Sequence, residues 1–127
     1  MSELLEAKGA WEGTLVLLFG IEFVEVTRAR VIGELAIRDE LRTVGGALHG
    51  GALMAFADTI GAVATIANLS PGSTTSTLES KTNFLGAGRA ETTPVHVGRR
   101  TMVWQTRVTD ENARLLSLTT RTQIVLS

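Results

Sequence analysis

One apolar stretch decides the fold of this chain, and it reads His49-Gly50-Gly51-Ala52-Leu53-Met54-Ala55-Phe56-Ala57-Asp58-Thr59-Ile60-Gly61-Ala62-Val63-Ala64. The apolar pattern continues to Leu69, where residues 68–72 supply strong helix breakers. We therefore expect a helix over residues 50–69. Because this helix is apolar almost all round, other elements must cover most of its surface.

Asp58 is the only formally charged side chain between Arg42 and Glu79. Desolvation disfavours an ionised carboxylate in such a segment, so its presence indicates a function. Gly50 and Gly51 lie about two helical turns before Asp58, on the same face, and their bare backbone N–H groups are candidate donors. A carboxylate and N–H donors are what acyl transfer needs, namely a base or nucleophile and a place for an oxyanion. The alternatives are a capping or interface salt bridge for Asp58 and a tight helix entry for the glycines.

The composition is that of one globular domain spanning residues 1–127, with 44% apolar and 20% charged residues. A net charge of −1 argues against broad nucleic-acid binding. The absence of cysteine excludes disulfides and thiolate metal sites, and two histidines are too few for a His-rich one, so we expect no metal. The acidic N-terminus is unlike a signal peptide, and Asp58 favours a buried helix over a membrane span. A cytoplasmic location is the expectation.

The rest of the chain predicts strands around this helix. Residues 2–8 read as a short helix, within an N-terminal lead-in over 1–14. Alternating β-branched and aromatic patterns predict strands over 21–26, 29–37, 75–84, 90–99, 102–108 and 115–126. Pro94 indicates an edge or a bulge in its strand. The fold class is therefore α+β, with one long central helix wrapped by a curved antiparallel sheet of about five to six strands.

Several segments resemble the hotdog-fold acyl-CoA thioesterases, and more narrowly the phenylacetate-pathway (PaaI-type) branch. They are the His-Gly-Gly opening with its downstream acid, the run Thr77-Leu78-Glu79-Ser80-Lys81-Thr82-Asn83-Phe84-Leu85, the hairpin His96-Val97-Gly98-Arg99-Arg100-Thr101 and the strand end Val108-Thr109-Asp110. The resemblance covers about residues 15–126. It implies hydrolysis of an acyl-CoA thioester, with an aryl, phenylacetyl or medium-chain acyl group.

The resemblance also implies roles for individual residues. Asp58 takes the place of the catalytic carboxylate, and Gly50 that of the glycine whose N–H polarises the thioester carbonyl. His49 shapes the turn before the helix and orients substrate or water. Thr77 falls where some relatives carry a serine that assists water, and Thr43 stands where the family often has Asn or Gln.

Coenzyme A enters only as part of the substrate, and no separate cofactor is expected. Arg89, Arg99 and Arg100 are candidates for its phosphates, although a short basic run is usually an ordinary solvated surface. His96 is expected to be a surface or packing residue. The expected assembly is a homodimer, doubled to a homotetramer, with the sites at subunit interfaces.

Two other functions remain open from the sequence. A hydratase or dehydratase acting on acyl thioesters would need a His–acid pair, and no second pair has a suitable spacing. A non-catalytic acyl-CoA-binding regulator would keep the coenzyme A surface but would not need Asp58.

Overall fold

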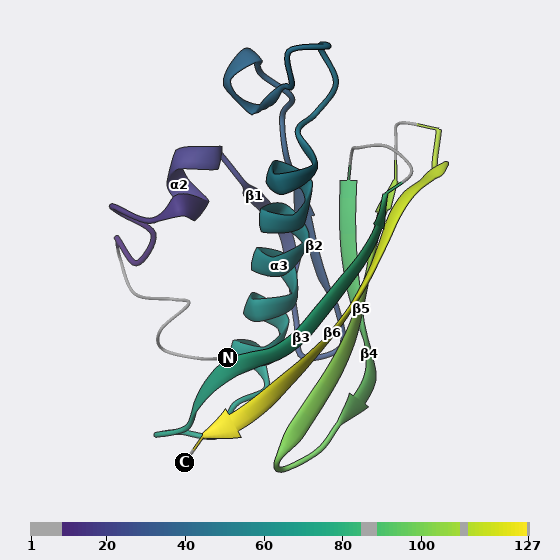
Figure 1. Cartoon of the computed structure of the whole chain (residues 1–127). Coiled ribbons are helices and arrows are strands. Elements are labelled where there is room, and N and C mark those ends of the chain that lie inside the picture. The colour runs from purple at the N-terminus through teal and green to yellow at the C-terminus, as the bar shows by residue number, and fades with distance from the viewer. Residues whose placement is uncertain (1–8, 85–88, 110–111, 127) are drawn as a thin grey trace.

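A six-stranded antiparallel sheet curves around one long helix (Figure 1). The structure, a computed structural model, describes residues 9–84, 89–109 and 112–126. The helices are α2 (Leu15–Phe19), α3 (Gly50–Ala67) and a 3₁₀ turn, η1 (Asp39–Leu41). The strands are β1 (Glu22–Val26), β2 (Val31–Glu34), β3 (Thr74–Phe84), β4 (Arg89–Val97), β5 (Thr101–Thr109) and β6 (Leu115–Leu126).

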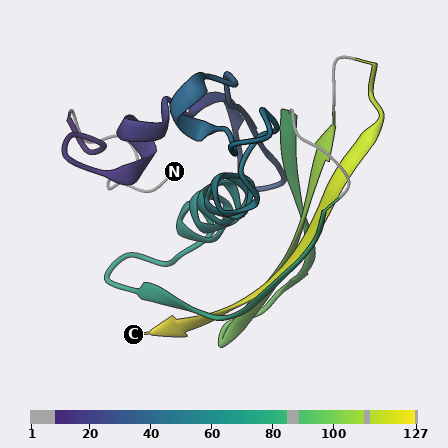
Figure 2. The ribbon, with the colours of Figure 1, turned by 45° about the horizontal axis from the view of Figure 1, so that its top comes forward.

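The strand order across the sheet is β1-β2-β4-β5-β6-β3, so β1 and β3 form its two edges. The chain leaves β2, runs through α3 and returns at the far edge as β3. Figure 2 shows α3 nearly end-on, lying in the hollow of the curved sheet. This arrangement confirms the hotdog architecture that the sequence predicts.

Pro94 marks a bulge. The pairing of β4 with β5 shifts between Pro94 and His96, whereas the strand itself lies between two others inside the sheet. Proline has no N–H to donate to a ladder, and a bulge removes the need for one. The bulge that the sequence left open is therefore confirmed, and Pro94 is also locally at an edge, because the described pairing of β4 with β2 ends at Thr92.

The core forms where α3 meets the concave face of the sheet. The helix contributes Phe56 and Ile60, both fully buried, and the sheet contributes Val31, Trp104 and Val108. By length and composition α3 also qualifies as a membrane span, but 56% of it is buried inside the molecule. Burial of that extent is typical of the core helix of a globular domain.

One face of α3 stays uncovered in the single chain. Gly51, Met54 and Asp58 are exposed and follow one another at helical spacing. A helix this apolar is expected to be covered on most sides, so the bare face is available to another chain.

The structure differs from the sequence prediction mainly near the N-terminus. The predicted helix over residues 2–8 lies outside the described residues, whereas α2 was not predicted. Thr14 caps α2 through its side chain, and Gly20 ends it at φ 72°. Strand β2 is shorter than predicted, because its pairing with β4 covers only Val31–Gly33.

We expect Gly33→Ala to destabilise the fold, because α3 packs directly on this glycine. A Cβ at Gly33 would lie 2.4 Å from Ile60 Cδ1, and the fully buried Ile60 has little space to move. Overpacking of this kind typically costs about 1–3 kcal/mol of unfolding free energy, measurable by urea denaturation. The control is Gly45→Ala, whose nearest contact would be an ordinary 3.7 Å.

Ile60→Val removes the obstructing methyl group. The double variant Gly33→Ala/Ile60→Val should therefore be less destabilised than the sum of its single variants. Strict additivity would contradict the packing described for this contact.

Candidate functional site

One part of the candidate site lies at the N-terminus of α3, where His49 is the N-cap. The backbone N–H of Gly51 donates to His49 Nδ1 over 2.8 Å, so the imidazole accepts there and carries its proton on Nε2. The main chain of His49 is tied back to the loop, because its N–H donates to Leu41 O over 2.8 Å. Leu41 is buried in the core and anchors that loop. His49 therefore shapes the turn, as the sequence predicts.

Gly50 offers an available donor at this helix end. Within the described residues its N–H has no hydrogen-bond partner, whereas the N–H of Gly51 is occupied by His49. The first N–H groups of a helix carry a partial positive charge and readily bind anions. Of the two glycines named from the sequence, Gly50 is thus the better placed to meet a developing oxyanion.

Asp58 lies on the uncovered face of α3, and its side chain is 53% exposed. The apolar sequence neighbours of Asp58 predict that its carboxylate is desolvated, and this prediction is wrong for the single chain. Helical periodicity explains the difference, because the neighbouring Ala57 and Ile60 are buried, whereas Asp58 lies at the edge of the uncovered face with about half of its side chain exposed. A second chain on this face would remove the carboxylate from water.

Arg121 on β6 is the partner of Asp58. Its Nη1 lies 3.1 Å from Asp58 Oδ1 and also donates to the main-chain oxygen of Asp58. The arginine side chain is only 1% exposed. Burial lowers the pKa of Arg121, and the charge of Asp58 opposes this shift. The sequence alone does not predict this partner.

Thr77 joins the same group. Its hydroxyl accepts a hydrogen bond from Arg121 Nη2 over 2.6 Å, so one guanidinium links Thr77 to Asp58. Thr43 does not join them. It is exposed in a turn beyond η1, where its N–H donates to Ala47 O and its carbonyl accepts from Gly46 N. The structure therefore brings together Asp58 and Thr77, but not Thr43.

Gly50 and Asp58 are too far apart along α3 to act on one atom. Eight residues of α-helix correspond to about 12 Å. A reacting carbonyl needs contacts of about 3 Å to both its oxyanion donors and its nucleophile or base. A site that uses both groups must therefore take them from two different chains.

Two of the arginines predicted to bind the coenzyme A phosphates lie away from Gly50 and the N-terminus of α3. Arg99 and Arg100 are exposed at the turn between β4 and β5, beside a cavity of about 510 Å³ that Asn68 also lines. This cavity is at the C-terminal end of α3, opposite Gly50 (Figure 1). Arg89 begins β4, and its side chain lies outside the described residues. The exposed His96 is close to the same turn.

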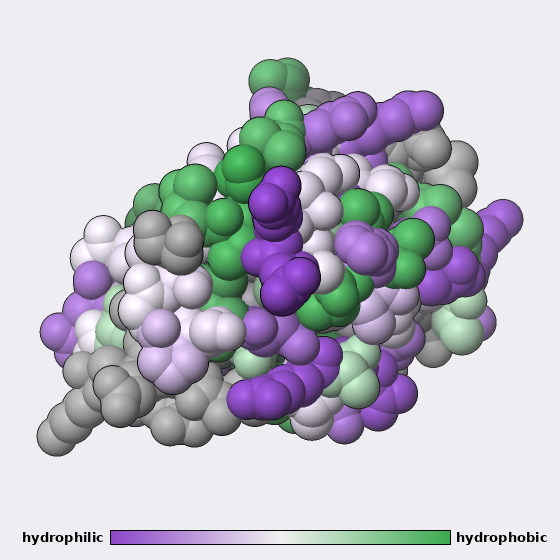
Figure 3. Space-filling model, turned by 90° about the horizontal axis from the view of Figure 1, so that it is seen from below, coloured by the Kyte–Doolittle hydropathy of each residue, from purple (hydrophilic) through white to green (hydrophobic). Residues whose placement is uncertain are grey.

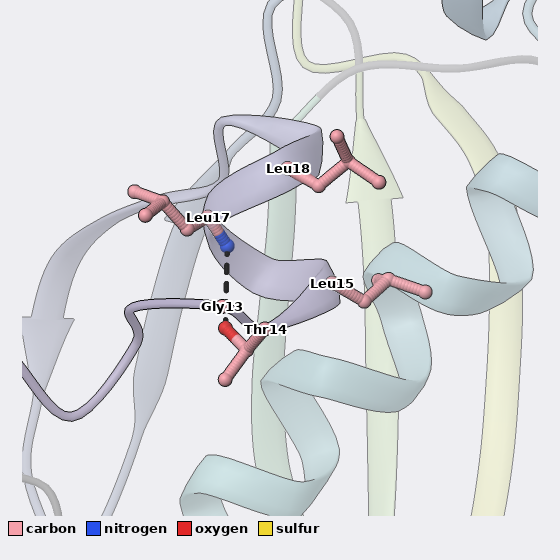
Figure 4. Close-up of a pocket in the computed structure, with 5 residues that line it drawn as sticks. All are labelled: Gly13, Thr14, Leu15, Leu17 and Leu18. Atoms are coloured by element: carbon pink, nitrogen blue, oxygen red, sulfur yellow. Dashed lines mark hydrogen bonds between the residues drawn. The ribbon is translucent and has the colours of Figure 1, made fainter.

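The molecule viewed from this end mixes hydrophilic and hydrophobic side chains (Figure 3). A second cavity, of about 480 Å³, lies beside α2 and is lined by Leu15, Leu17 and Leu18 with Gly13 and Thr14 (Figure 4). In Figure 4 Leu15 and Leu18 extend to one side of α2 and Leu17 to the other. Among the described residues, no group of three or more His, Asp or Glu side chains is placed to hold a metal ion.

Comparisons with known proteins agree on one family. The model of the thioesterase superfamily matches residues 45–117, more than half of the chain. The 1,4-dihydroxy-2-naphthoyl-CoA hydrolase of Escherichia coli is 30% identical, over 98% of this chain and 93% of its own length.

Solved thioesterase structures are also similar to this chain. A thioesterase from Haemophilus influenzae superposes with a TM-score of 0.89 at 26% identity, covering 100% of this chain and 92% of its own. A hypothetical thioesterase protein from Streptococcus pneumoniae, determined with coenzyme A, superposes with a TM-score of 0.76 at 26% identity, covering 84% of this chain and 86% of its own.

We expect His49→Ala to lower the unfolding free energy by about 1 kcal/mol, because it removes the N-cap acceptor of α3. His49→Asn should keep most of the stability, since Asn Oδ1 occupies the place of Nδ1 and also caps helices. Chemical denaturation of the two variants measures the difference. His96→Ala is the matched control and should leave stability unchanged. Equal losses for His49→Ala and His49→Asn would contradict the capping role.

Proposed function

Because this chain belongs to the thioesterase superfamily and is a thioester hydrolase, we propose that it cleaves an acyl-CoA at sites shared between two protomers. The products are a free carboxylic acid and coenzyme A. The observation that carries the proposal is the placement of a free N–H donor at Gly50 and a half-exposed carboxylate at Asp58 on one helix, about 12 Å apart.

In the proposed reaction the thioester carbonyl oxygen accepts a hydrogen bond from Gly50 N–H of one protomer. Asp58 of the other protomer takes a proton from a water molecule, whose oxygen attacks the carbonyl carbon. The tetrahedral intermediate collapses by breaking the C–S bond, and the leaving coenzyme A thiolate takes up the proton that Asp58 holds, which returns Asp58 to its carboxylate. Direct attack by Asp58, followed by hydrolysis of the resulting anhydride, is the second route to the same products.

A second copy of this chain fits the exposed features. The edge strand β3 is 11 residues long, and a long edge strand presents backbone groups for pairing with another chain. The uncovered face of α3, with Gly51, Met54 and Asp58, is a second exposed surface that a partner chain could cover. A two-fold dimer would contain two equivalent sites, and a pair of dimers would make the proposed tetramer.

The acyl group is proposed to be an aryl, phenylacetyl or medium-chain group. The name of the Escherichia coli relative, a 1,4-dihydroxy-2-naphthoyl-CoA hydrolase, supports the aryl class. The structure with coenzyme A from Streptococcus pneumoniae supports coenzyme A as the carrier. Arg99 and Arg100 are the proposed partners of its phosphates, and membership of the phenylacetate-pathway branch remains a prediction.

We expect Asp58→Asn to lower kcat by at least about 100-fold, because the amide cannot take up the proton. Acyl-CoA affinity should change little. The assay follows released thiol with a colour reagent over a panel of aryl-, phenylacetyl- and medium-chain acyl-CoAs, and calorimetry measures binding. Wild-type turnover in a folded Asp58→Asn protein would refute the assignment of Asp58.

Mixing two inactive variants tests the shared site. Gly50→Val blocks approach to the N–H donor, whose loss typically costs 10²–10³-fold in kcat, or about 3–4 kcal/mol of barrier. Co-expressed Gly50→Val and Asp58→Asn chains form some mixed dimers, in which one site has both groups intact. About a quarter of wild-type activity should return if chains mix at random in a two-fold dimer. No recovery despite proven mixed dimers would place both groups of each site in one chain.

A further inference from the structure

Arg121 is a buried basic side chain that contacts the exposed Asp58. It points from β6 toward α3, and its side chain is 1% exposed. The neighbouring inward positions of β6 are polar as well, namely Ser117, Thr119 and Gln123, and all three are buried. Removing a guanidinium from water is costly unless it is paired and hydrogen-bonded.

The guanidinium is held by a defined set of partners. Nη1 meets the carboxylate and the main-chain oxygen of Asp58, while Nη2 donates to Thr77 Oγ1 over 2.6 Å and to Gln123 Oε1 over 2.8 Å. Gln123 is itself fixed, because its Nε2 donates to Thr75 Oγ1 over 3.2 Å. Among the described residues, the one anion recorded against this buried cation is Asp58.

The helix is shaped to admit the arginine. Gly61 lies one turn after Asp58, and a Cβ there would be 2.2 Å from Arg121 Cδ and 2.9 Å from Nη1. The stem of Arg121 therefore passes against bare helix backbone. Alanine at this position would favour the helix, so the glycine is explained by the close approach of Arg121.

Stability alone is a weak explanation for this arrangement. Replacing a buried ion pair by well-packed apolar residues is often neutral or stabilising, and here one member of the pair is half-exposed. What the contact does supply is orientation. Arg121 occupies Asp58 Oδ1, and no partner of Oδ2 is recorded within the described part of the chain, so that oxygen is available to a water or a thioester.

We propose that Arg121 is a positioning residue of the thioesterase site, which fixes the Asp58 carboxylate and links Thr77 to it. This inference rests on the proposed function. Arg121 does not touch the substrate. It acts through Asp58, so its removal should affect turnover and not acyl-CoA binding.

The test compares Arg121→Met, Arg121→Gln and Arg121→Lys with the wild-type protein in the thiol-release assay. For the two neutral variants kcat should fall by about 100-fold, the typical cost of misplacing a catalytic group by about 1 Å, with KM little changed. Arg121→Lys should recover part of kcat relative to Arg121→Gln, because it restores a positive charge beside Asp58. Arg107→Met, an exposed arginine on the adjacent strand β5, is the control and should match the wild type.

A double variant separates positioning from a general structural effect. Adding Arg121→Met to Asp58→Asn should not lower the residual turnover further, because Arg121 acts through the carboxylate that is already lost. A further loss would overturn the proposal. So would wild-type kcat in either folded neutral variant, or an Arg121→Lys variant no better than Arg121→Gln.

If the neutral variants fail to fold, Gly61→Ala offers a second test that removes no polar group. The added methyl displaces the arginine stem, so kcat should fall while KM is retained, and an unchanged kcat would overturn the proposal. Failure of the proposed function is distinguishable. It would appear as turnover that survives Asp58→Asn, whereas failure of this inference alone would leave Asp58→Asn inactive and Arg121→Met active.

Discussion

Close packing of α3 on the concave face of the sheet is the constraint on which the other features of this molecule depend. Gly33 on β2 and Gly61 on α3 lack side chains where the two layers meet most closely, at Ile60 and Arg121 respectively. With one side of the helix committed to the sheet, the opposite side carries Gly51, Met54 and Asp58 into solvent. The same packing therefore builds the core and exposes Asp58, the carboxylate that we assign to catalysis.

The electrostatics of the site are divided between the two layers. The cation, Arg121, is buried in the sheet layer and its anion, Asp58, is half-exposed on the helix. Because the buried guanidinium of Arg121 contacts one oxygen of the Asp58 carboxylate, the carboxylate keeps a defined orientation while about half of the side chain stays exposed. The N–H donor at Gly50 belongs to the same helix but points from its end, about 12 Å away along the axis. This separation is why the proposed chemistry needs a second protomer.

Much of the fold could be predicted from the sequence, because its signals are local. Alternation in residues 21–26 and the breakers after Ala67 predicted β1 and the end of α3 closely. The five-residue helix α2 was missed, since it is too short for periodicity to show and is defined by the caps Thr14 and Gly20. The prediction that Asp58 is shielded from water was also wrong for the single chain, because sequence neighbours do not indicate which face of a helix meets the sheet.

Arg121 was missed for a physical reason. In β6 the alternate residues Leu116, Leu118 and Ile124 are the apolar set, so the pattern favours the face opposite to Arg121 as the buried one. The structure buries the polar set instead, from Ser117 to Gln123. The pairing of Arg121 with Asp58 spans 63 positions of the chain, and a single sequence carries no local signal for a contact at that distance.

The central claim is that the oxyanion donor and the carboxylate of each site come from different protomers. A crystal structure with a non-hydrolysable ketone analogue of an acyl-CoA tests it most directly. We expect the ketone oxygen about 3 Å from Gly50 N of one protomer and the ketone carbon facing Asp58 of its neighbour, directly or through one water. A ketone bound against both groups of a single chain, or against neither, would contradict the account.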